Sequence, residues 1–210
     1  MEGERFRGLR EEYEAAGRAA HYSSDRWEGT RHARRTDARE RRIVAAWLRR
    51  CGRIERALDL PCGAGRFHSL LQESARVVIS ADAARPMLVR HPGAARLQAS
   101  AHALPLRDGC AEFALCSRLL HHLGAAEERR LVLCELARVS RRWAVVSHFD
   151  RASLQALRSR LCGRSDGRLA LSVAAFRAEV AACGWIERER AWVLRGFSEQ
   201  TWVLLEKAGP

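Results

Sequence analysis

The sequence predicts an α/β protein: an αβα sandwich around a mostly parallel, seven-stranded sheet with an antiparallel pair at its C-terminal edge. Short apolar runs alternate with helical stretches from residue 56 onward, and a tight turn at Gly63-Ala64-Gly65 joins the first run to a helix. The last two runs follow one another without a helix between them, which suits an antiparallel pair. At 210 residues and 47% hydrophobic content, the chain suits one domain with a full-sized core.

The first 55 residues are polar and helical in pattern, and we expect them to form a cap or lid on the sheet. One helix is predicted from about Leu9 to Ala20. A second is predicted from Arg39 to Cys51, where apolar side chains recur at three-to-four spacing. Residues 56–150 form the second part of the chain, and residues 151–210 the third, with a helix and two edge strands.

The strands and helices of these two later parts follow in alternation along the chain. The strand candidates are Arg56–Leu60, Arg76–Asp82, Ala95–Ser100, Glu112–Ser117, Trp143–Asp150, Trp185–Trp192 and Thr201–Glu206. The helix candidates are Phe67–Glu73, Pro86–Val89, Ala126–Val139 and Ser172–Cys183. No internal repeat interrupts this order, which favours a single domain.

The chain is strongly basic, with a formal net charge of +12. Lys207 is its one lysine, and the abundance of arginine and alanine is typical of a GC-rich coding sequence, whatever the partner. The arginines are spread along the chain apart from a denser zone at Arg31–Arg50, and no aromatic residues are interleaved with them for base stacking. Nucleic-acid binding is therefore an alternative explanation of the charge, not the favoured one.

Targeting and cysteine patterns indicate a cytoplasmic protein. No run reaches the ~18–20 apolar residues of a membrane span, and the charged start of the chain lacks a signal-peptide core. The seven cysteines are scattered without a Cys-x-x-Cys pair, so the sequence predicts reduced thiols, without a zinc site or a disulfide framework.

The most informative segment is Arg56–Phe67. An apolar run ends at Asp59, a glycine turn follows, and a helix begins; glycine there lets a ligand approach the backbone. The segment resembles motif I of class I S-adenosylmethionine-dependent methyltransferases, with Pro61 in place of the first of the three motif glycines. The resemblance implies that S-adenosyl-L-methionine is the cofactor and that the turn positions its methionine tail. The turn residues expected to bind it are Asp59, Pro61, Cys62, Gly63, Ala64 and Gly65.

Asp82, followed by Ala83, ends the second strand candidate about 20 residues after the glycine turn. A carboxylate at this place can accept hydrogen bonds from both ribose hydroxyls of a nucleoside. The alternative is a strand-end aspartate that caps the next helix. The resemblance favours the ribose role.

The segment 97–106 is similar to the loop that holds the adenine in the same methyltransferases. The aspartate usual in that loop is Ser100 here, and a serine hydroxyl can accept the same hydrogen bond more weakly. Ala101 and Leu104 are expected to complete the adenine site. The alternative is an ordinary strand–turn–strand connection with Leu104 in the core.

The segment Phe113–Leu123 resembles the fourth strand of the family and its exit, where Ser117 and Arg118 are expected to face the methionine moiety and the substrate. It lacks the Asn-Pro-Pro-Tyr sequence of enzymes that methylate base or amide nitrogens. Cys116 lacks the context of a nucleophile, and Ser117 is a poor metal ligand, so no metal is expected.

Three histidines are candidates for catalysis. His121 and His122 are adjacent and point about 100° apart on a helix, so at most one faces a shared ligand. His122, or His148 at the end of the fifth strand candidate, could deprotonate a hydroxyl acceptor. Structural roles are open for each.

Tyr22, Trp27 and Arg31 fall in or beside the turn-rich link between the two N-terminal helices. Two amphipathic rings and a planar cation suit a lid that closes over substrate or cofactor. Alternatively, Trp27 pins the first helix to the sheet.

The chain also looks like a bacterial subgroup with an Asp-Leu-Pro-Cys-Gly-x-Gly-Arg motif. It is therefore interpreted as a class I methyltransferase that transfers a methyl group to a small-molecule or carrier-bound acceptor. The resemblance implies that residues 1–55 form a cap or lid, residues 56–150 the cofactor-binding core, and residues 151–210 a helix and edge strands on the substrate side. The alternatives are an RNA or protein methyltransferase that docks through Arg31–Arg50, an inactive cofactor-binding module, and a dinucleotide oxidoreductase, whose glycine spacing differs. The acceptor and the oligomeric state are left open.

Overall fold

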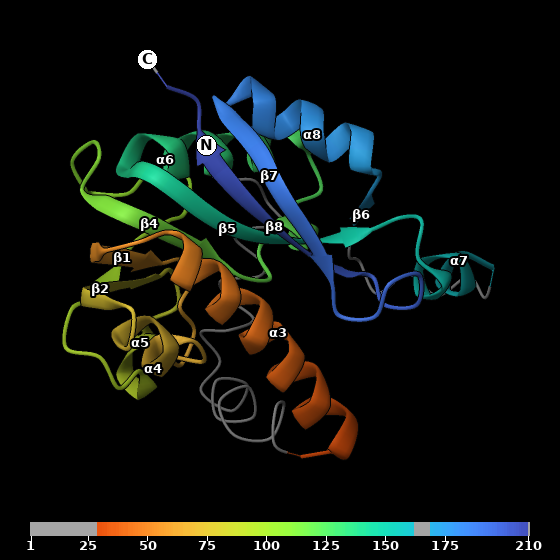
Figure 1. Ribbon diagram of the computed structural model, residues 1–210, viewed down its shortest axis with the longest axis horizontal. Coiled ribbons are helices and arrows are strands. Elements are labelled where there is room, and N and C mark those ends of the chain that lie inside the picture. The colour runs from red at the N-terminus through yellow and green to blue at the C-terminus, as the bar shows by residue number, and fades with distance from the viewer. Residues whose placement is uncertain (1–28, 162–168, 210) are drawn as a thin grey trace.

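The computed structural model describes residues 29–161 and 169–209. It shows a twisted sheet covered by helices on both faces (Figure 1). Among the described residues the sheet has eight strands, seven of which follow the order β3-β2-β1-β4-β5-β8-β7. The helix predicted at Leu9–Ala20 and the lid residues Tyr22 and Trp27 lie outside the described residues.

The strands confirm the predicted arrangement, a mostly parallel sheet that ends in antiparallel strands. Their bounds are β1 Ile54–Asp59, β2 Ala75–Asp82, β3 Arg96–Gln98, β4 Ala111–Cys116, β5 Ser140–Asp150, β6 Ala170–Leu171, β7 Trp185–Trp192 and β8 Gln200–Lys207. Strand β8 runs antiparallel to β5 and to β7, so the last two strands form one edge of the sheet. The short β6 pairs with the end of β5 and was not predicted, because two residues carry no periodicity.

The helices divide between the two faces of the sheet in Figure 1, with α6 and α8 on one face and α3, α4 and α5 on the other. Their bounds are α3 Arg31–Arg50, α4 His68–Gln72, α5 Arg85–Arg90, α6 Ala126–Val139, α7 Leu154–Leu161 and α8 Val173–Ala182, with a short 3₁₀ turn at Leu120–His122. Helix α7 was not predicted.

Helix α3 begins at Arg31, well before the predicted start at Arg39. Thr30 caps it: its side-chain oxygen accepts a hydrogen bond from the Ala33 amide at 3.0 Å. The intervening residues are polar because only the later turns pack on the sheet, through Val44, Trp47 and Leu48. A polar helical turn lacks the apolar stripe from which the helix was recognised.

Two apolar clusters hold the layers together. One joins β1, β4 and β5 to α6 and α8 and includes Leu133, Leu136 and Phe176. The other joins the opposite face of the sheet to α3 and α4 and includes Trp47 and Trp202. With both faces covered, polar side chains have room chiefly at the strand ends.

Cys134 on α6 and Cys183 after α8 form a disulfide whose Cα atoms are 4.7 Å apart. This corrects the expectation that the cysteines are reduced. The two cysteines are 49 residues apart in sequence and meet because α6 packs beside α8, which their spacing could not reveal. Four other cysteines in the described ranges are free, and three of these, Cys62, Cys110 and Cys116, are buried.

Within residues 29–161 and 169–209, no helix is long and apolar enough to cross a membrane. The same ranges contain no group of three or more His, Cys, Asp or Glu side chains placed to hold a metal ion.

Candidate functional site

The glycine turn lies where β1 ends and before α4 begins. Gly63 has φ +54° and Gly65 has φ +90°, a left-handed conformation that other residues adopt only with strain. A Cβ atom on Gly65 would lie 2.5 Å from Cδ of Pro92, whereas a Cβ on Gly63 would meet no atom within 4 Å. The turn is therefore packed against protein at Gly65 and open at Gly63.

Asp59, the last residue of β1, is 1% exposed, and neither of its carboxylate oxygens has a hydrogen-bond partner in the described structure. Burial raises the pKa of this carboxyl well above its usual range, and the nearby Asp82 carboxylate raises it further. A buried acceptor without a partner is costly in the free protein. A ligand that brings a positive charge or N–H donors to this place would satisfy it.

Asp82 lies at the end of the neighbouring strand β2 and connects two backbone segments. One carboxylate oxygen accepts from the Gly63 amide at 2.8 Å, and the other accepts from the Ala84 amide at 2.8 Å. Burial raises the pKa of Asp82, while these backbone hydrogen bonds lower it. The bond to Ala84 matches the capping alternative. The bond to Gly63 was not predicted and shows that Asp82 also orients the glycine turn.

The loop after β3 is fixed by two side chains of α6. Glu135 accepts from the Leu104 amide at 2.6 Å, and Arg138 donates to the Leu104 carbonyl at 3.0 Å. Leu104 and Ala101 are buried, while Ser100 is partly exposed and its hydroxyl accepts from the His102 amide at 3.3 Å. These hydrogen bonds fix the backbone of the loop at Leu104, and Ser100 is the part of the loop that a ligand can reach from solvent. Glu135 was missed because an exposed-looking glutamate in a helix carries no signal of a distant loop.

Arg118 follows β4 in a left-handed conformation, φ +59°, which is uncommon for a residue with a side chain. Its amide donates to the Ser147 hydroxyl of β5 at 2.7 Å, which holds this exit in place. The side chain turns towards α3, where Nη2 donates to Glu40 at 2.7 Å. Ser117 before it is partly exposed.

Glu40 of α3 is completely buried and accepts hydrogen bonds from two arginines. Arg66, directly after the glycine turn, donates from Nη2 at 2.5 Å and also bonds Asp37 at 2.8 Å. Arg118 donates to the other carboxylate oxygen. Glu40 thereby ties α3 to the glycine turn and to the exit of β4. It was missed in the sequence, although its place four residues before Val44 on the apolar stripe was a signal.

The three histidines differ in their surroundings. His148 is 1% exposed, and both ring nitrogens are occupied: Nδ1 donates to the Phe149 carbonyl at 3.0 Å, and Nε2 accepts from Arg190 at 2.9 Å. Burial and the Arg190 charge lower the pKa of His148 to about 4. This arrangement argues against His148 as a general base. His121 is buried and stacks on Phe149. His122 is half-buried, so of these two neighbours His122 is the better placed to reach a substrate.

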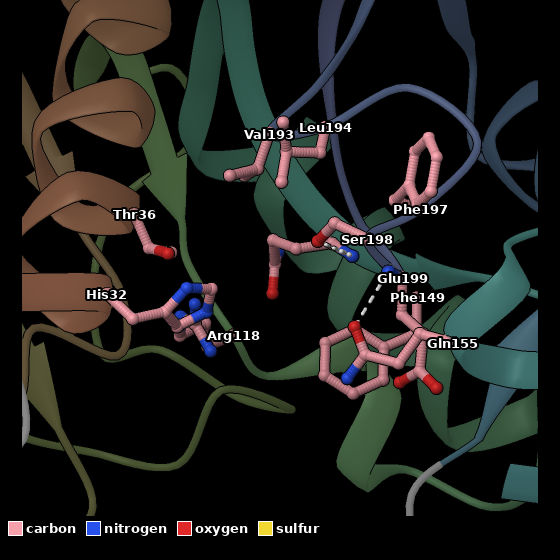
Figure 2. A pocket seen from close by; sticks show the side chains of 11 residues that line it. His32, Thr36, Arg118, Phe149, Gln155, Val193, Leu194, Phe197, Ser198 and Glu199 are labelled. Atoms are coloured by element: carbon pink, nitrogen blue, oxygen red, sulfur yellow. Dashed lines mark hydrogen bonds between the residues drawn. The ribbon is translucent and has the colours of Figure 1, made fainter. Parts of the chain in front are cut away.

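A pocket of about 330 Å³ opens beside Arg118, between α3 and the connection from β7 to β8 (residues 193–199). In Figure 2, His32, Thr36 and Arg118 lie on one side of it, and Val193, Leu194 and Phe197 on the other. Phe149 at the end of β5 and Gln155 of α7 also line it. Arg31, expected to contact substrate, is exposed at the start of α3 and is not among the lining residues; its neighbour His32 is.

The predicted cofactor residues and this pocket lie at one edge of the sheet. Strands β1, β2, β3, β4 and β5 are parallel, so their carboxyl ends share that edge. In open parallel sheets, ligands bind at this edge near the point where the strand order reverses, which here lies between β1 and β4. The turn at Gly63, Asp82 and the loop at Ser100 lie on one side of that point, and the pocket lies on the other.

Comparisons with known proteins gave a family model and solved structures of the same fold. Residues 58–146 match a family model described as a methyltransferase domain. No curated protein matches the chain significantly in sequence.

Solved structures show the same fold at low sequence identity. Magnesium protoporphyrin IX methyltransferase from Synechocystis PCC 6803, with bound S-adenosylhomocysteine, is similar over 96% of this chain and 99% of its own, with a TM-score of 0.76 and 14% identity. An S-adenosylmethionine-dependent methyltransferase from Methanosarcina mazei covers 75% of this chain and 94% of its own, with a TM-score of 0.62 and 15% identity.

Proposed function

We propose that this chain is a class I methyltransferase that uses S-adenosylmethionine, and that it methylates a small-molecule or carrier-bound acceptor in the pocket between α3 and residues 193–199. The observation that carries the proposal is the buried carboxylate of Asp59, without a partner in the described structure and next to the open glycine turn. A site of this kind fits a ligand with a cationic amino-acid tail. The pocket beside it supplies a place for the acceptor.

The residues at the carboxyl edge fit the three parts of the cofactor. Asp59 would pair with the ammonium group of the methionine tail, and the turn at Gly63 leaves the space for that tail. Asp82 keeps lone pairs for ribose hydroxyls beyond the two backbone amides that it accepts from. Ser100, with Ala101 and Leu104, would border the adenine. The proposed cofactor site is completed by four further residues: Cys62, Ala64, Ala83 and Ser117.

When bound, S-adenosylmethionine supplies a methyl group on a sulfonium, which is already an activated leaving group. The protein therefore has to align the acceptor with that methyl and exclude water. Arg118 is suited to orient an acceptor because its backbone is fixed by Ser147 and its side chain lines the pocket. His122 is the remaining candidate for a base where the acceptor must lose a proton.

The pocket lining indicates the kind of acceptor. Four of the eleven lining residues are apolar: Phe149, Val193, Leu194 and Phe197. The other seven are polar: His32, Thr36, Arg118, Gln155, Ser198, Glu199 and Gln200. A pocket that combines aromatic and aliphatic surface with this many polar groups fits an acceptor that has both apolar and hydrogen-bonding parts. The similar Synechocystis enzyme is also named for a small-molecule acceptor.

The experiment has two parts. Calorimetric titration with S-adenosylhomocysteine should show stoichiometric binding. Incubation with S-adenosylmethionine labelled in its methyl group and a fractionated cell extract should then place the label in the small-molecule fraction or on an acceptor attached to a protein. Label found in RNA would contradict the proposed acceptor class, and cofactor binding without any transfer would favour an inactive binding module.

A further inference from the structure

Helix α3 presents a row of arginines on its outward face. With about 100° of rotation per residue, the five positions of the row fall within an arc of about 80° and span about 27 Å along the helix. All five side chains are exposed. The arginine row consists of Arg31, Arg35, Arg39, Arg42 and Arg49.

None of these five arginines forms an ion pair or a hydrogen bond through its side chain in the structure as described. Many other exposed arginines do have acidic partners. Arg50, one residue after the row, pairs with Glu189, and Arg177 pairs with Glu187 at 3.1 Å. The row is therefore a concentration of unpaired positive charge on a surface where glutamates neutralise many of the other arginines.

From Asp37 onward, the opposite face of α3 is held against the rest of the protein, which fixes the backbone of this part of the row. Val44, Trp47 and Leu48 are buried in the core, and Glu40 is buried between Arg66 and Arg118. A row carried on a helical backbone loses less backbone conformational freedom on binding than a flexible basic tail.

The N-terminal end of the row meets the pocket. His32 and Thr36, which line the pocket, each follow a residue of the row by one position. Figure 2 shows both on the side of the pocket formed by α3. A molecule that lies along the row therefore ends at the pocket mouth.

We propose that the arginine row docks an acidic helix of a partner protein that carries the methyl acceptor into the pocket. This inference rests on the proposed function of the pocket. Carboxylates four residues apart on a partner helix recur every ~6 Å, which equals the separation of Arg31, Arg35 and Arg39 along α3. The guanidinium group matches a carboxylate in a bidentate geometry.

The surroundings of the row favour a helix over single-stranded nucleic acid. Ala38 and Ala46 lie beside the row, and the only aromatic residue of α3, Trp47, is buried on its other face. Single-stranded nucleic acid is bound by stacking its bases on exposed aromatic rings, which the row lacks. Small side chains between charges instead permit the close approach of a second helix.

The test compares two labelled helical peptides of identical composition by fluorescence anisotropy. One carries glutamates four residues apart along one face, and the other carries the same glutamates around the whole helix. The one-faced peptide should bind at least about fivefold more tightly, and its affinity should fall as salt is raised from about 50 to about 200 mM. Equal affinities, or no binding of either peptide, would overturn the proposal.

Matched variants locate the contact. Arg35→Gln/Arg42→Gln should weaken binding of the one-faced peptide by roughly five- to tenfold. Arg90→Gln/Arg107→Gln removes the same charge from two exposed arginines elsewhere and should change it less than about twofold. Equal losses of peptide affinity in both variants would show that binding depends only on the net charge of the protein, and would refute the arginine row as the docking surface.

Two further measurements separate the remaining outcomes. A 20-base-pair RNA duplex that binds more tightly than the peptide, and loses affinity in Arg35→Gln/Arg42→Gln, would replace the protein partner with nucleic acid. Titration with S-adenosylhomocysteine should be unchanged in both variants. Failure of the unmodified protein to bind that ligand would refute the proposed function, whereas loss of peptide binding alone would refute the dock.

Discussion

The buried carboxylate of Glu40 on α3 accepts a hydrogen bond of 2.7 Å from Nη2 of Arg118 at the exit of β4. Its other oxygen accepts from Arg66, directly after the glycine turn. One side chain thus connects the three segments that border the cofactor site and the pocket. Removing the carboxylate would take away the acceptor that these two arginines share.

Glu40→Ala should destabilise the protein by about 3 kcal/mol, because it removes a buried carboxylate that accepts hydrogen bonds from two largely buried arginines. Chemical denaturation measures the change in the free energy of unfolding. Glu127→Ala is the matched control, since Glu127 pairs with Arg130 while 72% exposed, and it should cost less than about 1 kcal/mol. A similar loss of unfolding free energy in the two variants would mean that the buried contacts of Glu40 do not stabilise the fold.

Asp59→Asn should stabilise the free protein at neutral pH and weaken S-adenosylhomocysteine by about tenfold or more. Burial raises the pKa of Asp59 above its ordinary 3.8, so the folded state keeps a proton that the unfolded chain has lost. The unmodified protein therefore loses stability as pH rises from 3.8 through the raised value. The amide carries no charge and avoids this loss.

Thermal melts between pH 4 and 8, with calorimetric titration at pH 7, test both halves of this prediction. The advantage of Asp59→Asn in melting temperature should grow with pH. A variant that binds the ligand as tightly as the unmodified protein would remove Asp59 from the cofactor site.

Substitutions of the two glycines of the turn should have different effects, one on stability and the other on ligand binding. Gly65→Ala places a Cβ 2.5 Å from Pro92 in a left-handed backbone and should cost about 3 kcal/mol of stability. Gly63→Val meets open space and should stay folded, at about 1–2 kcal/mol for the backbone strain, but should lose S-adenosylhomocysteine binding.

Gly184→Val is the control for Gly63→Val. Gly184 has φ +77°, and a Cβ added to it would meet no atom within 4 Å. It lies before β7, at the ends of the strands opposite to the cofactor site. The two variants should melt at similar temperatures, and only Gly63→Val should fail to bind the ligand. Normal binding by Gly63→Val would show that the glycine turn does not face the cofactor.

Much of the fold was predictable from the sequence because its elements carry strong local signals. The alternation of apolar runs and helices predicted seven of the strands and the antiparallel edge, and α6 appears with the predicted bounds. The first turns of α3 were missed because they are polar, and β6 because it has only two residues. Helix α7 was missed although Leu154, Leu157 and Leu161 recur at helical spacing. Their positions depend on contacts with residues far away in sequence.

Only those parts of the site that have a local sequence pattern were predictable. The glycine turn and the acidic ends of β1 and β2 follow from local sequence. The bond from Gly63 to Asp82, the support of Leu104 by Glu135 and the burial of Glu40 do not, because each joins elements that only the folded sheet brings together. The same reason explains why His148 was expected to face the substrate although Arg190 occupies its ring nitrogen.

His148→Gln should flatten the acid dependence of stability and leave methyl transfer intact. Burial and Arg190 lower the pKa of His148 from 6.5 to about 4, so the unfolded chain takes up a proton between these values while the folded protein does not. The stability present above pH 6.5 is therefore lost as pH falls towards 4, by roughly 3 kcal/mol from this residue. Glutamine can still accept from Arg190 and donate to the Phe149 carbonyl but does not titrate, so urea denaturation at pH 7 and pH 4.5 should show a smaller difference for the variant. An equal difference would assign the acid dependence to other groups, and a selective loss of turnover in a folded variant would restore His148 as a catalytic base.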